Sequence, residues 1–287
     1  MQDFTNAEQH AGWWEALNPP IYLVSVLPGL GVWLIAGDSR LWLAGLVLGT
    51  LAVVLLQHAI NLLNDVSDWR LGADVNKFDS WVRVHGEDTR LASLHGLISA
   101  LAGSLLGTGL LLWSERLWIL VIAVPMVVLG FLYNAGPRPL SYTFLGEWVT
   151  GLCYGPGVFG CLWLLAGLQI SPATGFGALA FAALAMALLL SHQPPQIRTD
   201  RAAGKQSFAV RYGARRTCQT ARWLAVLFLV SIGTGIGTGE TRSATKVVFA
   251  VIGLAAIVFL WRSPPNPKRI LLPSTGVIVA CLIVNAM

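Results

Sequence analysis

Charged side chains are scarce in this sequence. Of its 287 residues, only 11% are Asp, Glu, Lys or Arg, whereas a typical soluble domain carries about 25%. Hydrophobic residues make up 55% of the chain, and its mean hydropathy is +0.65. A soluble enzyme of one or two domains is therefore excluded. The composition predicts an integral membrane protein.

Other signals are also missing. The first 15 residues are polar and lack both a basic segment and a short apolar segment, so we expect no cleavable signal peptide. The net charge of +5 bears on membrane orientation rather than on nucleic-acid binding. The four cysteines show neither CxxC spacing nor a nearby histidine, which favours buried thiols over a metal site or disulfides. They are Cys153, Cys161, Cys218 and Cys281.

Long uncharged runs set the number of membrane spans. A spanning helix needs about 20 apolar residues. One run, residues 148–197, is long enough for two helices, and Ser171-Pro172 is typical of a new helix start within the break at 167–175. With the seven other runs, this predicts nine spans. The runs are residues 16–37, 41–64, 91–114, 117–137, 148–197, 223–239, 247–261 and 270–287.

Basic residues are distributed unequally over this topology. With nine spans, the N-terminus and the loops after the second, fourth, sixth and eighth spans share one side. Because cytoplasmic loops carry an excess of Lys and Arg, we expect that side in the cytoplasm of a bacterial cell and the chain in its inner or plasma membrane. Of the 19 basic residues, fifteen fall on that side and four on the other, namely Arg40, Arg116, Arg242 and Lys246.

Three aspartates follow the second uncharged run. Asp65 and Asp68 are three residues apart and share a face of a continuing helix, and Asp74 follows. Asn64 adds another oxygen ligand. Carboxylates at a membrane boundary repel each other unless a cation joins them, and Mg²⁺ prefers such ligands together with substrate phosphates. The pattern is therefore compatible with a Mg²⁺ site, and acids that are merely solvated are the plain alternative.

A second polar segment follows the sixth predicted span. Asp200 lies at the same expected membrane depth as the first cluster, four helices later, so the two groups can face each other. Lys205 and Arg211 can hold a polyanion such as a diphosphate. An ion pair is the plain alternative for Asp200, and the cytoplasmic charge bias alone explains most of the neighbouring arginines.

His58 is a polar residue inside a predicted span. It precedes Asn64 by six positions and therefore points to roughly the same helix face. A functional role is the default hypothesis for such a residue, but we favour a hydrogen bond between helices. His85 and His95 are expected near the membrane interface.

Several segments together resemble a known family. The NDxxD motif at residues 64–68, followed by Gly72 and Asp74, resembles the first aspartate motif of the UbiA superfamily of intramembrane prenyltransferases. Its spacing is most similar to the branch that attaches polyprenyl chains to 1,4-dihydroxy-2-naphthoate in menaquinone synthesis. Residues 14–19, 130–147 and 200–213 resemble the same branch, and the resemblance covers about residues 12–285.

This resemblance implies an all-α fold in which about nine transmembrane helices surround a central, lipid-open cavity. Residues 16–287 would form one domain after a polar segment at residues 1–15. The implied reaction transfers a prenyl or polyprenyl group from a prenyl diphosphate to a naphthoate- or benzoate-like aromatic acceptor, with Mg²⁺ as cofactor, in quinone-lipid synthesis. No nucleic-acid partner is implied, and the sequence identifies no protein partner.

The resemblance also implies roles for particular residues. The implied catalytic residues are Asp65, Asp68 and Tyr133. The implied metal ligands are Asn64, Asp65, Asp68, Gln196 and Asp200. The implied diphosphate ligands are Arg83, Arg138 and Lys205, and Asp74, His192 and Arg198 are further site residues.

The sequence departs from the family at the second aspartate motif. That motif is a pair of aspartates four residues apart, but Gln196 occupies the first position, and His192 stands where the naphthoate branch has asparagine. Glutamine coordinates through its carbonyl but brings no charge. Three consequences remain open: Arg198 replaces part of the second ion's role, the second ion binds weakly, or catalysis has been lost.

Three classes of function agree with the sequence. The first, which we predict, is a prenyltransferase with an aromatic acceptor. The second is another diphosphate-ionising member of the superfamily, which cyclises its substrate or uses a different acceptor. The third is a non-catalytic relative that serves as a lipid- or quinone-binding membrane subunit. An acceptor product separates the first from the second, and metal-dependent diphosphate release separates both from the third.

Cysteine labelling tests the predicted orientation. Ser67→Cys and Thr199→Cys, introduced singly, should resist a membrane-impermeant thiol reagent in intact cells and react after permeabilisation, because both lie on the side with most basic residues. Arg242→Cys, on the opposite side, is the matched control and should react in intact cells. Labelling of Ser67→Cys or Thr199→Cys in intact cells would show that the orientation is the opposite of the predicted one.

Overall fold

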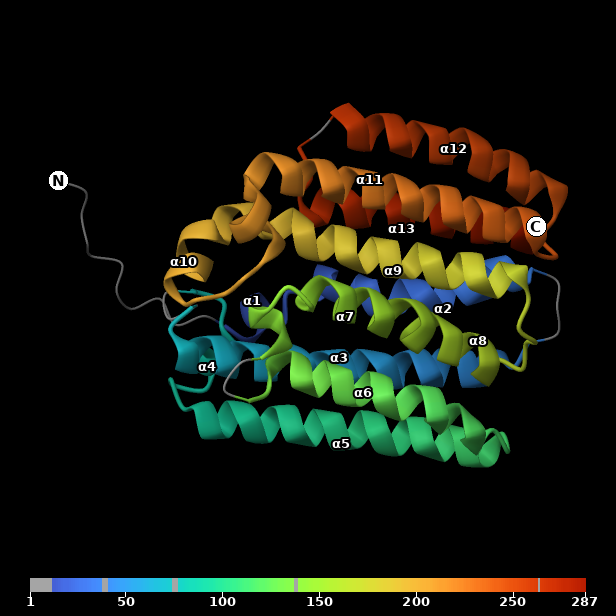
Figure 1. Cartoon of the computed structure of the whole chain (residues 1–287). Coiled ribbons are helices and arrows are strands. Elements are labelled where there is room, and N and C mark those ends of the chain that lie inside the picture. The colour runs from blue at the N-terminus through green and yellow to red at the C-terminus, as the bar shows by residue number, and fades with distance from the viewer. Residues whose placement is uncertain (1–11, 38–40, 74–76, 137–138, 263) are drawn as a thin grey trace.

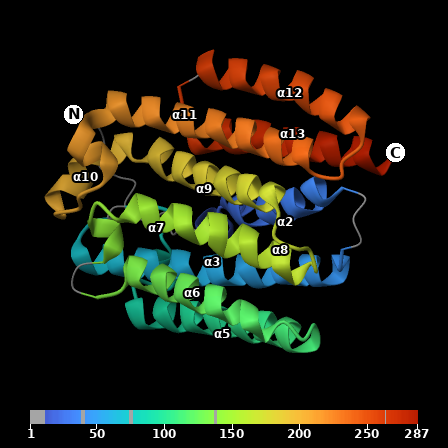
Figure 2. The same cartoon turned by 45° about the vertical axis from the view of Figure 1, so that its right-hand side comes forward.

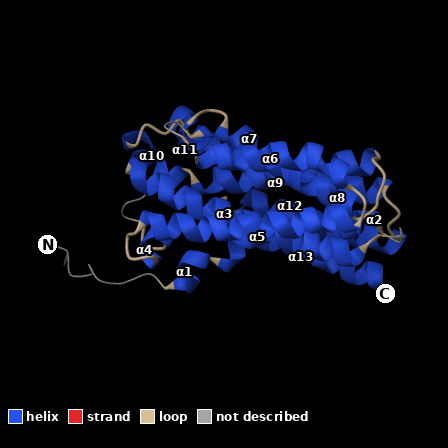
Figure 3. Ribbon diagram, turned by 90° about the horizontal axis from the view of Figure 1, so that it is seen from below, coloured by secondary structure: helices blue, strands red, loops and turns tan. Residues whose placement is uncertain are grey.

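The computed structural model describes residues 12–37, 41–73, 77–136, 139–262 and 264–287. These residues form helices and loops and contain no strand (Figure 3), which confirms the all-α prediction. The α-helices are α1 (Trp13–Leu17), α2 (Leu23–Ala36), α3 (Leu43–Leu71), α4 (Trp81–Val84), α5 (Thr89–Trp113), α6 (Leu120–Asn134), α7 (Gly146–Leu152), α8 (Cys161–Leu165), α9 (Pro172–His192), α10 (Ile197–Ala202), α11 (Phe208–Thr238), α12 (Ser243–Arg262) and α13 (Pro267–Ala286). Short 3-10 turns are η1 (Pro19–Tyr22), η2 (Leu117–Ile119), η3 (Leu140–Tyr142) and η5 (Pro194–Gln196), and η4 (Cys153–Gly160) is a π-helical segment.

Nine helical segments of the described chain are long and apolar enough to cross a membrane, as predicted. The break in the longest uncharged run also lies where expected, because α9 begins at Pro172 and Ser171 and Thr174 form a capping box. The seventh span is longer than the run at 223–239 that predicted it. The segment has a kink at Gly213, whose φ of 80° and ψ of 162° are not helical. After the kink, arginine-rich turns extend the helix before its apolar part, because arginine is a good helix former.

The spans run side by side as a bundle (Figures 1 and 2). α9 packs against α11, and α3 packs against α5, while α5 and α12 lie at opposite edges. The short helices α1, α4 and α10 gather at one end, away from the C-terminal end of α13 (Figure 1). The loops after the second and sixth spans therefore share an end of the bundle with the start of the first, as the topology required.

The outer helices carry large apolar side chains on their exposed faces. On α5, Leu101 is 54% and Leu105 is 72% exposed, and on α12 Val251 is 65% exposed. An apolar surface of this extent is unfavourable in water. It suits a bilayer, in which helices satisfy their own backbone hydrogen bonds.

Three fully buried phenylalanines join the helices of the second half. Phe159 stacks on Phe181 with ring centres 5.4 Å apart, and Phe228 lies 5.8 Å from Phe181. A Cβ atom on Gly177 would overlap the ring of Phe159, so glycine permits this close approach of η4 and α9. The phenylalanine contacts hold α9 and α11 together, and the second polar segment lies between these two helices in the sequence.

Candidate functional site

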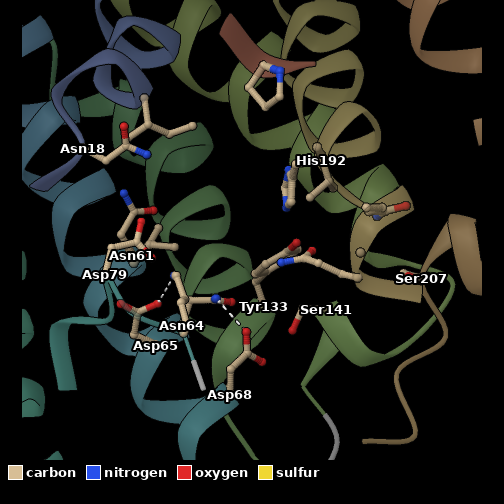
Figure 4. Close-up of a pocket in the computed structure, with 18 of the residues that line it drawn as sticks. Asn18, Asn61, Asn64, Asp65, Asp68, Asp79, Tyr133, Ser141, His192 and Ser207 are labelled. Atoms are coloured by element: carbon tan, nitrogen blue, oxygen red, sulfur yellow. Dashed lines mark hydrogen bonds and ion pairs between the residues drawn. The ribbon is translucent and has the colours of Figure 1, made fainter. Parts of the chain in front are cut away.

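A cavity of about 630 Å³ lies at the end of the bundle where α1, α4 and α10 meet. Figure 4 shows the acidic end of α3 on one side of it and His192 of α9 on the other. The cavity brings together residues that are far apart in the sequence. Eight of the predicted site residues line it: Asn64, Asp65, Asp68, Tyr133, His192, Gln196, Asp200 and Lys205.

Asp65 is tied to the loop that follows α3. Its side chain is 5% exposed, and one carboxylate oxygen, Oδ1, lies 2.8 Å from Nζ of Lys77. The other oxygen accepts a hydrogen bond of 2.8 Å from the backbone N–H of Trp81, the first residue of α4. The loop is therefore folded back over this carboxylate.

Asp68 lies three residues further along α3 and has three partners. The hydroxyl of Tyr142 donates to its Oδ1 at 2.8 Å, and the side-chain amide of Asn64 donates to its Oδ2 at 3.0 Å (Figure 4). Nζ of Lys205 lies 3.6 Å from the same Oδ2. Since Lys205 belongs to the second polar segment, this ion pair joins the two acidic segments at one site, as expected.

Asp200 is buried in α10 and is held by the loop that follows it. Its Oδ2 accepts a hydrogen bond of 2.7 Å from the hydroxyl of Ser207, and its backbone carbonyl accepts one of 2.8 Å from the N–H of Lys205. Burial raises the pKa of the Asp200 carboxyl, whereas the Ser207 hydrogen bond and the charge of Lys205 act against the rise. A cation in the cavity would favour the charged form.

Glu147 of α7 forms a buried network at the cavity wall that the sequence did not predict. Its Oε1 accepts hydrogen bonds from the side chain of Gln193 at 3.1 Å and from the backbone N–H of Phe208 at 2.7 Å. Its Oε2 lies 3.3 Å from the guanidinium of Arg211. Arg211 pairs with Glu147 and does not line the cavity, so its role in holding a polyanion stays a prediction.

Other predicted residues lie elsewhere. The guanidinium of Arg83 lies over the ring of Trp69, 5.7 Å from its centre, and Arg83 does not line the cavity. Arg198 is exposed on α10 and does not line it either. Asp74 and Arg138 fall outside the described residues.

Several lining residues were missed in the sequence, among them Asn61, Asp79 and Ser141 (Figure 4). Asn61 precedes Asn64 by three residues on α3, and residues at this spacing lie on the same helix face. The sequence could therefore have predicted that Asn61 faces the site. The position of Asp79 depends on how the loop before α4 folds, and no local pattern predicts that.

The expected gathering of carboxylates around one cation is not seen. Among the residues that the structure describes, no three His, Cys, Asp or Glu side chains lie close enough together to hold a metal ion. Asp65 and Asp68 are instead each paired with a lysine, Lys77 and Lys205. The carboxylate oxygens thus already face cationic groups.

A second cavity, of about 310 Å³, lies further along the bundle between α3, α5, α6 and η4. Its lining is almost entirely apolar, and Ile60 lines both cavities. Val124 and Val128 line it as well, although they are 52% and 48% exposed on the outer surface of α6. The second cavity therefore reaches the apolar outer surface of the bundle.

Comparison with known proteins gives related sequences. The model of the UbiA prenyltransferase family matches residues 23–272. A 2-carboxy-1,4-naphthoquinone phytyltransferase from Synechocystis sp. is 31% identical over 246 residues, which cover 83% of this chain and 78% of that protein. The chloroplastic phytyltransferase of the same name from Arabidopsis thaliana is 31% identical over 85% of this chain and 66% of its own length. A 1,4-dihydroxy-2-naphthoate octaprenyltransferase from Bacillus subtilis is 25% identical over 83% of this chain and 76% of its own.

Solved structures show the same fold. A UbiA homolog from Archaeoglobus fulgidus bound to DMAPP and Mg²⁺ has a TM-score of 0.69 with 17% identity, covering 96% of this chain and 98% of that one. The apo structure of a UbiA homolog from Aeropyrum pernix K1 has a TM-score of 0.68 with 16% identity, covering 94% and 99%. The bundle of this chain is thus arranged as in those proteins.

The Glu147 network makes a testable contribution to stability. Glu147→Ala should lower the free energy of unfolding by about 2–3 kcal/mol, because it leaves buried donors and the Arg211 guanidinium without an acceptor. Thermal unfolding of the purified protein in detergent measures this, with the exposed Arg215→Ala as control. Arg211→Ala added to Glu147→Ala should cost little more, and an unchanged midpoint for Glu147→Ala would show that the network does not hold α7 to α11.

Proposed function

The chain belongs to the UbiA prenyltransferase family, and on this basis we propose that it transfers a prenyl group from a prenyl diphosphate to a naphthoate-type aromatic acceptor within the membrane. One observation carries the proposal: the polar cavity that joins the acidic segments of α3 and α10 lies next to an apolar cavity, with Ile60 in the wall of both. The names of the sequence relatives support a naphthoate over a benzoate acceptor.

The two cavities match the two halves of a prenyl diphosphate. The charged head fits the polar cavity, which contains lysines, hydroxyls and carboxylates. The hydrocarbon tail fits the second cavity, whose walls are apolar. Since Val124 and Val128 connect this cavity with the outer surface of α6, a tail dissolved in lipid can enter without crossing water.

The donor set fits a divalent cation. Carboxylate and amide side chains from α3 and from the second polar segment line one cavity. Mg²⁺ prefers oxygen ligands of this kind. Asp65 and Asp68 already attract an ammonium group each. When bound, Mg²⁺ would neutralise the diphosphate and so make it a better leaving group. The proposed ligands are Asn64, Asp65, Asp68, Gln196 and Asp200.

The chain's own groups have separate tasks. Lys205 and Lys77 line the cavity and can donate charged hydrogen bonds to the diphosphate oxygens; Arg138 is a further proposed ligand. The rings of Tyr133 and Trp81 form part of the wall, where their faces stabilise positive charge on the allylic carbon and exclude water.

We propose that this end of the bundle faces the cytoplasm. The acidic segments and fifteen of the 19 basic residues lie on the same side of the predicted topology. In membrane proteins the cytoplasmic loops carry an excess of Lys and Arg. The diphosphate group of a prenyl diphosphate is charged and stays in water. A polar cavity that opens to the cytoplasm therefore agrees with the proposed substrate.

Transfer of a radiolabelled prenyl group tests the function. Wild-type protein in lipid nanodiscs should form a Mg²⁺-dependent product with 1,4-dihydroxy-2-naphthoate and not with 4-hydroxybenzoate, across prenyl diphosphates of several lengths. Asp65→Asn and Asp68→Asn should each lower turnover well over tenfold, because stabilising a leaving group is worth several kcal/mol. Asp88→Asn, which changes an exposed residue capping α5, is the matched control.

The outcomes separate the three classes of function. No product with any acceptor or chain length, from folded protein, would end the transferase proposal and favour a non-catalytic binding subunit. Diphosphate release without an acceptor product would indicate a cyclising enzyme or a different acceptor. Full activity of Asp65→Asn and Asp68→Asn would contradict the metal assignment.

Gln196 provides a separate test. Gln196→Asp adds a charge to the cavity wall and should lower the Mg²⁺ concentration for half-maximal rate by at least roughly threefold, because the added carboxylate attracts the ion. Arg198→Ala should be close to wild type, since Arg198 does not line the cavity. If Arg198→Ala instead lowers the rate severely and Gln196→Asp leaves the Mg²⁺ dependence unchanged, Arg198 replaces the second ion. A Mg²⁺ titration of the three proteins measures this.

A further inference from the structure

Three histidines form a hydrogen-bonded row beside the polar cavity. His58 on α3 and His95 on α5 are joined through their Nε2 atoms at 3.2 Å, which confirms the predicted bond between helices. His95 Nδ1 lies 3.2 Å from Nε2 of His85, which follows α4. At the other end of the row, the hydroxyl of Tyr22 lies 2.6 Å from Nδ1 of His58.

Each contact in this row uses a different ring nitrogen, which makes the row continuous. A neutral imidazole has one N–H donor and one acceptor nitrogen. If Tyr22 donates to His58, then His58 donates to His95 and His95 donates to His85. The reverse order satisfies all three contacts equally well. A row that is satisfied in both directions can pass a proton when every hydrogen shifts by one place.

A metal site does not explain the row. The nitrogens pair along a line and do not converge on one point, because His95 uses Nε2 toward His58 and Nδ1 toward His85. Within the described ranges no group of three such side chains is suited to a metal ion.

The inner end of the row lies at the wall of the site. Tyr22 does not itself line the polar cavity, but two residues next to the row do: Ile21, which precedes Tyr22, and Asn61, which lies one helical turn after His58 on α3. Trp81 also lines the cavity and donates its backbone N–H to Asp65. Its ring lies 5.0 Å from that of His58, so the row and the acidic site share this residue.

The outer end of the row reaches the surface. His85 is half-buried, and the residues at 86–88 that follow it are exposed. The ring of Trp13 lies 5.6 Å from His85 and 5.5 Å from His95 and covers the row. The imidazoles therefore connect the cavity with solvent through an aromatic enclosure.

We propose that Tyr22, His58, His95 and His85 form a proton-transfer chain, which carries to solvent the proton that the aromatic acceptor loses from its hydroxyl. This rests on the proposed function. The acceptor's O–H bond breaks, and its electron pair stays on the oxygen and enriches the ring. Because Tyr22 lies behind the cavity wall, the proton reaches the oxygen of Tyr22 through a water molecule in the polar cavity. The ring then forms a carbon–carbon bond to the prenyl group, while the C1–O bond breaks and leaves its electron pair on the diphosphate.

Every proton is accounted for along the row. As Tyr22 receives the acceptor's proton, its own moves to His58 Nδ1, and the Nε2 proton of His58 moves to His95 Nε2. The Nδ1 proton of His95 moves to His85 Nε2, and the Nδ1 proton of His85 enters water. One proton leaves the cavity and all four side chains end neutral, with every hydrogen bond of the row now pointing the other way. The histidines regain their first tautomers by exchanging protons with water before the next turnover, because the same shift run backwards would carry a proton into the cavity.

His95→Gln tests the chain, because an amide keeps a donor and an acceptor but cannot pass a proton between them. We expect kcat to fall by about tenfold or more and the solvent deuterium isotope effect on kcat to increase. KM for prenyl diphosphate and the half-saturating Mg²⁺ concentration should stay the same. Ser99→Ala is the matched control: Ser99 lies one turn further along α5 and donates to the carbonyl of Leu55 on α3 at 2.8 Å, and its loss should leave kcat unchanged.

A second variant covers the case in which His95→Gln does not fold. His95→Ala should lose activity and regain it with added imidazole but not with pyrrole, which has a donor and no acceptor. Wild-type kcat in His95→Gln, or a change in KM alone with an unchanged isotope effect, would show that the row only holds α4 in place and would overturn the chain. Absence of product from the wild type would instead contradict the proposed function itself.

Discussion

The pairing of the α3 carboxylates with lysines is the interaction on which the site depends. Asp65 and Asp68 are 5% and 2% exposed at the end of an apolar bundle, and a buried charge without a partner is strongly unfavourable. Their lysines come from two separate loops, Lys77 after α3 and Lys205 after α10. Both loops must therefore fold inward, and this closes the end of the bundle into a polar cavity.

The same requirement explains why polar and apolar parts of the interior meet so abruptly. Hydrogen bonds and ion pairs are satisfied within the polar cavity, so the helices beyond it need no charge and pack through small residues and phenylalanines. A Cβ atom on Gly103 would lie 2.9 Å from the carbonyl oxygen of Ala52, which shows how closely α3 and α5 approach. One end of the interior is therefore suited to a charged group, and the rest is suited to a hydrocarbon chain.

Features set by local physics were predictable from the sequence. The spans follow from the absence of charge, the start of α9 from Ser171 and its following proline, and the acidic segments from their spacing. Contacts between distant residues were not predictable in this way. Glu147 and Arg211 are 64 positions apart, and neither has a neighbour that indicates the other. Arg83 was assigned to diphosphate by its motif, but it lies against Trp69, since the fold of the loop before it decides its direction.

The outward exposure of Val124 and Val128 has a consequence for how substrate is supplied. A lipid-borne molecule that enters beside α6 arrives by lateral diffusion in the plane of the bilayer. Its effective concentration is then its mole fraction among the lipids, and not its amount per volume of solution. Diluting the aqueous phase leaves that fraction unchanged, whereas adding inert lipid reduces it. Occupancy of the apolar cavity is therefore governed by the composition of the surrounding leaflet.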